Sequence, residues 1–257
     1  MNKSRKEIID IFDKMMLLGH HLKNNKNKLN SEFFCLTRNK NILVADEYSS
    51  MRMKELLSAH YSVPLICEED KSHNEKLEND CFVLIDPLDG SRSFRDCFCG
   101  WVIQYAVIKS GLVVESIVVA PEYNSGIIYS ETFGTEIIGA SGLRGFFRES
   151  NKPVCVIDNY PRPIDWLHTM VRSEFDYINC GSFGLKLILV YLGAANLFLK
   201  NVSLKLWDVA PMIGPLSMRG MVLTDGSRKA IALDKVSIEG LICGRAEIVA
   251  YFVAEKT

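Results

Sequence analysis

The sequence predicts an α/β protein in which layers of helices alternate with mixed sheets. Short apolar runs typical of strands alternate along the 257-residue chain with longer segments whose apolar residues recur at helical spacing. Hydrophobic residues make up 48% of the chain, which is enough for a substantial core and argues against disorder. Acidic residues gather at the edges of apolar runs, where α/β folds usually place their ligands.

The N-terminal region is predicted to contain two helices. From Ser4 to Leu22, apolar residues recur at roughly helical spacing. The polar, basic run from Lys23 to Asn30 is interpreted as a solvated loop, with a flap over a site as the alternative. A second helix is expected over Glu47 to Ala59, with Asp46 as its N-cap.

Strand-like apolar runs then predict a mixed sheet over the first half of the chain. Ser110-Gly111 is typical of a hairpin turn, and Pro121 to Ser125 of a longer connection. The runs are Val63–Cys67, Cys81–Ile85, Val102–Lys109, Leu112–Ala120 and Gly126–Ser130.

The second half is expected to alternate between strand and helix again. A boundary near Glu149–Pro153 would divide the chain into an N-terminal α+β subdomain (1–150) and a C-terminal α/β subdomain (151–257). The expected strands are Val154–Ile157, Tyr177–Cys180, Ala195–Leu199, Met221–Thr224 and Leu241–Cys243. Helices are expected from about Ile164 and over Phe183–Gly193, Asp208–Met218 and Arg245–Ala254.

The stretch from Leu84 to Ser91, which reads Leu-Ile-Asp-Pro-Leu-Asp-Gly-Ser, is the strongest candidate for chemistry. Pro87 bars a helix between the two aspartates, and Gly90 allows a tight backbone path after them. Two carboxylates at the end of a strand suit a hard divalent cation.

Other acidic clusters favour this functional interpretation. Pro-x-Asp-Gly alone is also an ordinary turn signature. However, Glu68-Glu69-Asp70 follows an upstream apolar run, and Trp207-Asp208-Val209-Ala210 opens a helix-like segment downstream. Solvated surface alone does not explain three acidic clusters, each at the edge of an apolar element.

Glu-Glu, Asp-Pro-Leu-Asp-Gly-Ser and Trp-Asp-x-Ala together resemble the pattern of the inositol monophosphatase superfamily, and the likeness covers nearly the whole chain. Members are magnesium-dependent, commonly lithium-sensitive phosphomonoesterases. The resemblance implies the layered αβαβα sandwich of the sugar phosphatases, with mixed sheets and flanking helices. It also implies that the N-terminal subdomain carries most metal ligands and that the C-terminal one carries the Trp-Asp motif and the substrate contacts.

The acidic residues suit the hydrolysis of a phosphate ester. Such an ester is a dianion, and cations about 3.5–4 Å apart overcome its repulsion of a nucleophile. Magnesium prefers oxygen ligands. The expected metal ligands are Glu68, Asp86, Asp89 and Asp208, with the main-chain carbonyl of Leu88 as a further oxygen. We expect two or three Mg²⁺ ions, for which Mn²⁺ can substitute.

The same resemblance assigns the catalytic residues. Ser91 stands where the family more often has threonine, and its hydroxyl would help to orient the attacking water together with Glu68. Asp46 belongs to an Ala-Asp pair that matches the family and is the third expected catalytic residue. The amides of Gly90 and Ser91 would cradle the phosphate if they open a helix. The alternative role of both Ser91 and Asp208 is that of a helix N-cap.

The chain departs from the family pattern at Arg38 and Leu43, where members generally carry an acid and a threonine. A missing acid there could weaken an additional metal site, which puts the catalytic rate and lithium sensitivity in doubt. These departures keep open the alternative of a non-catalytic member of the superfamily that binds an anion or a nucleotide.

The resemblance is greatest to the 3′(2′),5′-bisphosphate nucleotidases of the CysQ type. Lys200 stands where these enzymes have a basic residue suited to a second phosphate, and Leu185-Lys186 resembles their Leu-Lys pair. The expected reaction is therefore hydrolysis of adenosine 3′,5′-bisphosphate to AMP and phosphate, and the alternative is an inositol-1-monophosphatase or related sugar phosphatase. Both lysines could equally lie on solvated faces. The candidate substrate-binding residues are Asp89, Gly90, Ser91, Ser182, Lys186, Lys200 and Asp208.

Charge and composition limit the partners. A net charge near −1 implies no general attraction to nucleic acid. The nearly apolar stretch from Leu187 to Leu199 is too short to span a bilayer. We expect a small phosphorylated substrate, no nucleic acid polymer, no membrane, and a monomer or homodimer. Eight cysteines without paired metal-site spacing, and no visible secretory signal, predict a cytoplasmic location.

Overall fold

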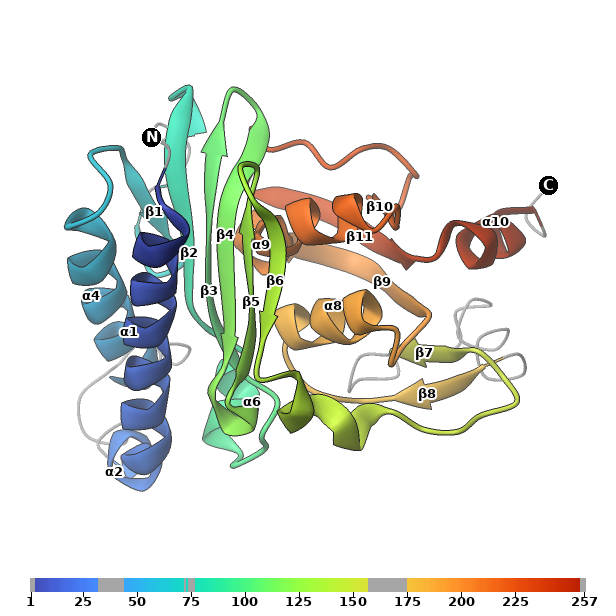
Figure 1. The fold of residues 1–257 in the computed structure, drawn as a ribbon, viewed down its shortest axis with the longest axis horizontal. Helices are drawn as coiled ribbons and strands as arrows, with labels where there is room; N and C mark the ends of the chain where they lie inside the picture. Colours follow the sequence, from blue (N-terminus) through green and yellow to red (C-terminus); the bar gives the residue numbers. More distant parts are fainter. Residues whose placement is uncertain (1–2, 32–43, 72, 74–76, 157–174, 255–257) are drawn as a thin grey trace.

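Helices and sheets alternate in layers across the molecule, as Figure 1 shows. The computed structural model describes residues 3–31, 44–71, 73, 77–156 and 175–254. Helices α1 (Arg5–Asn24) and α4 (Val44–Ser58) cover the outer face of a six-stranded sheet. Helices α8 (Phe183–Leu192) and α9 (Leu206–Met218) separate that sheet from a five-stranded one. Helix α10 (Ala246–Ala254) lies beyond the second sheet, which confirms the expected αβαβα layering.

The six-stranded sheet follows the chain in the order β1-β2-β3-β4-β5-β6. Strands β1 and β2 are parallel, and the other neighbours are antiparallel. The strands are β1 (Leu65–Cys67), β2 (Cys81–Asp89), β3 (Val102–Lys109), β4 (Leu112–Ala120), β5 (Ser125–Ser130) and β6 (Gly134–Ile138). The short 3-10 helices η1 (Pro121–Tyr123) and η2 (Ala140–Phe146) precede β5 and follow β6. The sequence patterns did not predict β6 or η2.

The five-stranded sheet has the order β10-β11-β9-β7-β8. It is mixed, because β7 is parallel to β8 and β9 whereas β11 is antiparallel to β9 and β10. The strands are β7 (Val154–Val156), β8 (Asp176–Ile178), β9 (Leu197–Lys205), β10 (Val222–Thr224) and β11 (Ser237–Gly244). Strands β9 and β11 are longer than predicted, and the helix expected from Ile164 lies outside the described residues. The division into subdomains at residue 150 stays a prediction.

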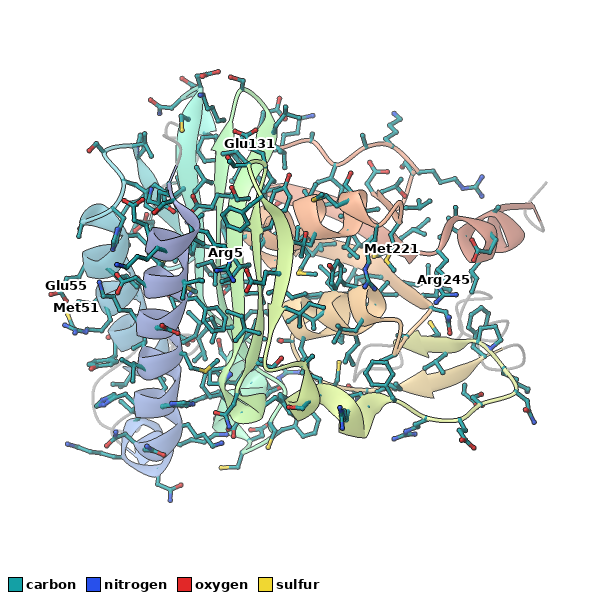
Figure 2. The ribbon with its side chains drawn as sticks, in the orientation of Figure 1. Arg5, Met51, Glu55, Glu131, Met221 and Arg245 are labelled. Carbon is teal, nitrogen blue, oxygen red and sulfur yellow. The ribbon has the colours of Figure 1, made fainter. Side chains whose placement is uncertain are left out.

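Two large apolar cores stabilise the layers. One lies between the outer helices and the six-stranded sheet, where Phe12 and Met15 of α1 pack with Trp101 and Tyr105. The other surrounds α8 and α9 between the two sheets. Side chains on the outer face of α4, such as Met51 and Glu55, point away from the sheet (Figure 2). No described helix combines the length and the apolar character needed to cross a membrane.

The N-terminal helix is confirmed, but the loop predicted after it is wrong. Ser4 and Glu7 form a reciprocal capping box at the start of α1. The helix continues to Asn24, and a second helix, α2, covers Lys26–Ser31. The ammonium groups of Lys23 and Lys26 lie 3.0 and 3.6 Å from the Glu122 carboxylate. These long-range ion pairs stabilise a basic segment that resembles a solvated loop when sequence is considered alone.

Candidate active site

The end of β2 carries the first two carboxylates of the site. The strand extends past the predicted end at Ile85 to Asp89, and its register with β3 shifts between Asp86 and Asp89. This irregularity accommodates Pro87, which cannot donate to the ladder. Gly90 follows with φ of +94°, and α6 (Ser91–Arg95) begins there. The turn that Gly90 was expected to permit is therefore present.

Asp208 joins these two residues from the first turn of α9. One oxygen from each of Asp86, Asp89 and Asp208 lies within 4.8 Å of the others, and all three side chains are buried. The structure thus brings together three of the four predicted metal-binding carboxylates as one cluster, and the fourth, Glu68, hydrogen-bonds the side chain of Asp86. Asp208 is not the helix N-cap, because Lys205 holds that position and donates its main-chain N–H to Asp208 Oδ2 at 2.8 Å.

Asp89 also caps the N-terminus of α8 by accepting its free main-chain N–H groups. Its Oδ1 accepts the main-chain N–H of Phe183 at 3.2 Å, and its Oδ2 accepts that of Gly184 at 2.6 Å. These donors are unpaired within the helix, and the dipole of α8 favours a negative charge there. Ser182, the N-cap of α8, accepts from Leu185 and hydrogen-bonds Asp89 through its side chain. The sequence reasoning missed this link between β2 and α8.

Burial and mutual repulsion disfavour negative charge in the cluster. Burial raises the pKa of Glu68 to about 7, and the nearby carboxylate of Glu69 adds to the shift. Burial also raises the pKa of Asp89 to about 6, although its hydrogen bonds from Gly184 and Phe183 oppose the shift. The pKa values of Asp86 and Asp208 are raised as well, by burial first and then by Glu68 and Asp89 respectively. The cluster therefore gathers carboxylate oxygens without enough nearby positive charge to balance them. Such oxygens are the ligands that Mg²⁺ and Mn²⁺ prefer.

Ser91 and Asp46 form a hydrogen-bonded pair next to the cluster. Ser91 Oγ lies 2.8 Å from Asp46 Oδ1 and 3.1 Å from the Leu88 carbonyl oxygen, and both can accept its proton. Asp46 was expected to be an N-cap, which is wrong, because α4 begins at Val44 and places Asp46 in its first turn. Ser91 is likewise not an N-cap, since Gly90 precedes the helix. The positions of Arg38 and Leu43 lie outside the described residues.

The two candidate lysines differ in their surroundings. Lys186 is only 1% exposed, so the alternative of a solvated face is wrong for it. Burial lowers its pKa, and the charges of Asp89 and Asp208 act in the opposite direction. Lys200 is half-buried, and burial likewise lowers its pKa against the attraction of Asp208. Both ammonium groups lie 5.1 Å from the centre of the Phe183 ring, so both lie beside the first residue of α8.

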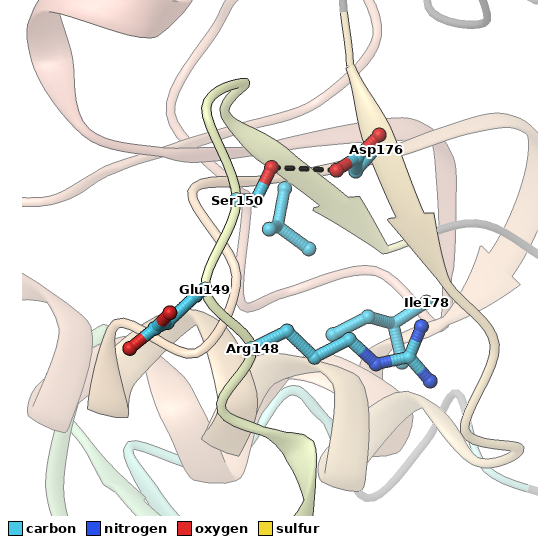
Figure 3. Close-up of a pocket in the computed structure, with 6 residues that line it drawn as sticks. Arg148, Glu149, Ser150, Asp176 and Ile178 are labelled. Atoms are coloured by element: carbon cyan, nitrogen blue, oxygen red, sulfur yellow. Dashed lines mark hydrogen bonds between the residues drawn. The ribbon is translucent and has the colours of Figure 1, made fainter.

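The structure adds Gln104 to the residues near the cluster. Its amide nitrogen is 3.1 Å from the Trp207 carbonyl oxygen and within 3.5 Å of oxygens of Asp86 and Asp89. The available signal was a side-chain amide in the middle of an otherwise apolar strand, Val102 to Ile108. A surface cavity of about 390 Å³ lies elsewhere (Figure 3). The residues that line it, which include Arg148, Ser150 and Asp176, are not candidate site residues.

The raised carboxyl pKa values predict how pH affects the stability of the metal-free protein. Unfolded Asp and Glu titrate near pH 4, whereas Asp89 and Glu68 titrate at about 6 and 7 in the folded state. The folded state thus binds more protons over this range, so this stabilising contribution is complete below about pH 4 and is lost as pH rises through about 7. We expect the Tm in a chelator to fall between about pH 5 and about pH 8, and Mg²⁺ to reverse much of the fall.

Scanning calorimetry with EDTA or with excess Mg²⁺ measures this effect. The variant Asp86→Asn removes a buried carboxyl group whose own pKa is raised, and it is expected to flatten the dependence. A Tm in EDTA that is constant or rises over the same range would contradict the prediction.

The sequence matches the model of the inositol monophosphatase family over residues 17–248, and the chain belongs to this family. The family consists of metal-dependent phosphatases that hydrolyse phosphate monoesters. This membership confirms the resemblance drawn from the Glu-Glu, Asp-Pro-Leu-Asp-Gly-Ser and Trp-Asp-x-Ala motifs.

One curated relative is the 3′(2′),5′-bisphosphate nucleotidase CysQ of Shigella flexneri, 27% identical over 152 residues. The match covers 58% of this chain and 61% of that relative, so the chain matches less than two thirds of its length. The crystal structure of CysQ from Bacteroides thetaiotaomicron has a TM-score of 0.76 at 16% identity, with 94% of this chain and 97% of that chain covered. The IMPase of Thermotoga maritima has a TM-score of 0.75 at 19% identity, with 98% and 96% covered. Both structures share the fold.

Proposed function

We propose that the protein is a magnesium-dependent phosphomonoesterase that hydrolyses adenosine 3′,5′-bisphosphate to AMP and phosphate. The observation that carries the proposal is the buried cluster of Asp86, Asp89 and Asp208, formed by two distant elements. The substrate assignment is supported by the lysines beside the cluster and by the similarity to a bisphosphate nucleotidase.

The metal-binding residues are the three aspartates, Glu68 and the main-chain oxygen of Leu88. We propose two or three Mg²⁺ ions, for which Mn²⁺ can substitute. When bound, the cations supply the positive charge that offsets repulsion between the phosphate dianion and an incoming oxygen nucleophile. The carboxylates hold this charge in a buried place, where electrostatic interactions are stronger than in water.

Glu68 and Ser91 act on the attacking water. A carboxylate that lies within hydrogen-bond reach of the water can accept its proton, and Glu68 lies beside Asp86, to which it hydrogen-bonds. Ser91 Oγ donates a hydrogen bond to Asp46 Oδ1. Its oxygen lone pairs then remain free to accept a hydrogen bond from water. The pair would therefore orient the water, and Glu68 would receive its proton as the new P–O bond forms. The ester P–O bond breaks in the same step, and the leaving alcohol oxygen takes a proton from solvent.

Lys200 provides the contact that selects the second phosphate. Its ammonium group lies beside the Phe183 ring and is half-buried, which leaves part of it accessible to an anion. A charge-assisted hydrogen bond to a phosphate suits this position. Lys186 is fully buried beside the same ring and adds to the positive potential without direct exposure.

A substrate panel tests the proposal. Phosphate release with Mg²⁺ is expected to be faster from adenosine 3′,5′-bisphosphate than from inositol 1-phosphate or fructose 1,6-bisphosphate. Because Lys200 serves the second phosphate, Lys200→Gln is expected to raise the KM for the bisphosphate about tenfold, the equivalent of one charged hydrogen bond.

The same variant should leave the KM for inositol 1-phosphate within about twofold, because it removes only the cation assigned to the second phosphate. Faster turnover of inositol 1-phosphate by the wild-type protein would favour an inositol monophosphatase. Binding of the nucleotide without hydrolysis by any divalent metal would favour the non-catalytic alternative.

A further inference from the structure

Gln104 is a fully buried side-chain amide in the middle of β3. It is directly opposite Asp86 in the pairing of β3 with β2. A buried amide that makes no hydrogen bond costs free energy, so such residues are retained where their hydrogen bonds serve a purpose.

The amide nitrogen serves three oxygens that belong to the metal-binding segments. Gln104 Nε2 lies 3.5 Å from Asp86 Oδ2, 3.4 Å from Asp89 Oδ2 and 3.1 Å from the Trp207 carbonyl oxygen. Trp207 immediately precedes Asp208 in α9. One –NH₂ group, which carries two protons, therefore links the two aspartates of β2 to the turn that presents the third.

Helix α8 packs closely against the Gln104 side chain at Gly184. A Cβ on Gly184 would lie 2.5 Å from Gln104 Oε1 and 3.2 Å from Asp89 Oδ2, so α8 approaches the amide as closely as a glycine permits. Within the described part of the chain, Oε1 itself has no hydrogen-bond partner. The amide oxygen thus makes no hydrogen bond, whereas the amide N–H groups face the carboxylates. This orientation costs the glutamine one hydrogen bond and orders the carboxylates of the cluster.

We propose that Gln104 is a positioning residue that sets the spacing of Asp86, Asp89 and Asp208 and thereby increases the affinity of the cluster for divalent cations. The inference rests on the proposed function only in that the cluster binds a metal ion. Groups that orient metal ligands change metal affinity by about tenfold to hundredfold when they are removed.

The test is Mn²⁺ binding to metal-free protein, measured by electron paramagnetic resonance. Gln104→Met keeps the length of the side chain but removes the donor, and its Kd for Mn²⁺ is expected to rise about tenfold to hundredfold. Ser116→Ala is the matched control, since Ser116 is buried on β4 and donates to the Pro211 carbonyl of α9 at 2.6 Å. It is expected to lower the Tm with a change in Kd of less than about twofold, because it loses a buried hydrogen bond away from the ligands.

A folded Gln104→Met variant with wild-type Mn²⁺ affinity would overturn the inference. If that variant does not fold, Gln104→Asn retains the amide but withdraws it by one methylene, and unchanged affinity there would have the same meaning. Failure of the proposed function is a different result: the wild type would bind Mn²⁺ with the expected dependence on Gln104 but release no phosphate from any ester in the panel.

Discussion

Replacing Asp89 with asparagine is expected to reduce the kcat for phosphate release by about a thousandfold or more. Asp89 is a proposed metal ligand, and loss of such a ligand removes several kcal/mol of transition-state stabilisation. Asn keeps one side-chain oxygen, which can still accept one of the two main-chain N–H groups that Asp89 binds at the start of α8. It also removes one negative charge from a cluster in which burial raises the carboxyl pKa. We therefore expect the folded structure to remain.

The measurement is steady-state turnover with saturating Mg²⁺, together with circular dichroism and the Tm of the variant. Asp96→Asn is the control, because Asp96 is exposed and its carboxylate pairs with Arg95 at 2.8 Å. It should turn over at the wild-type rate. Wild-type activity in Asp89→Asn would remove Asp89 from the metal site, whereas an unfolded variant would show that its capping role dominates.

Substituting Gly100 with alanine is expected to destabilise the protein by about 3 kcal/mol or more, because the new methyl group overpacks a rigid backbone contact. Its Cβ would lie 1.9 Å from the Cys180 carbonyl oxygen and 2.8 Å from the Gly181 Cα. These are main-chain atoms, which cannot move aside as a flexible side chain does. The Gly100 carbonyl also accepts the main-chain N–H of Ser182 at 2.8 Å, so a shift here would displace the start of α8.

Urea denaturation of Gly100→Ala and of Gly145→Ala provides the comparison. Gly145 is exposed, and its Cβ would meet nothing within 4 Å. Alanine at Gly145 should therefore change the free energy of unfolding by less than about 0.5 kcal/mol. Equal unfolding midpoints for the two variants would show that the backbone at Gly100 relaxes without cost.

Most helices and strands could be predicted because the apolar spacing and turn residues that indicate them lie within each element or next to it. The apolar spacing of α1 and the alternation of apolar runs with turn residues depend on neighbours in sequence. The failures arose from long-range contacts. Lys23 and Lys26 pair with Glu122, which converts an apparent loop into helix. Strand β6 has only half-buried residues, so it lacked the apolar signal that identified the other strands.

The site was predicted in part for a similar reason. The Asp-Pro-Leu-Asp-Gly motif indicates a pair of carboxylates, but no local pattern shows that Asp208 joins them, and the family resemblance supplied that step. The N-cap roles considered for Asp46 and Asp208 were wrong by about one helical turn, because the helices begin earlier than their polar residues suggested. Gln104 was missed because its hydrogen bonds are made to residues of β2 and α9, which are distant in sequence.

The hydrogen bonds from the start of α8 to Asp89 give this carboxylate two structural roles. It belongs to the acidic cluster on the first sheet, and it anchors the inner helical layer that supports the second sheet. If Asp89 binds a cation as proposed, ion occupancy and the mutual docking of these layers are coupled equilibria. By thermodynamic reciprocity, a cation that draws Asp89 into its preferred geometry alters the docking free energy, and any strain between the layers alters cation affinity by the same factor.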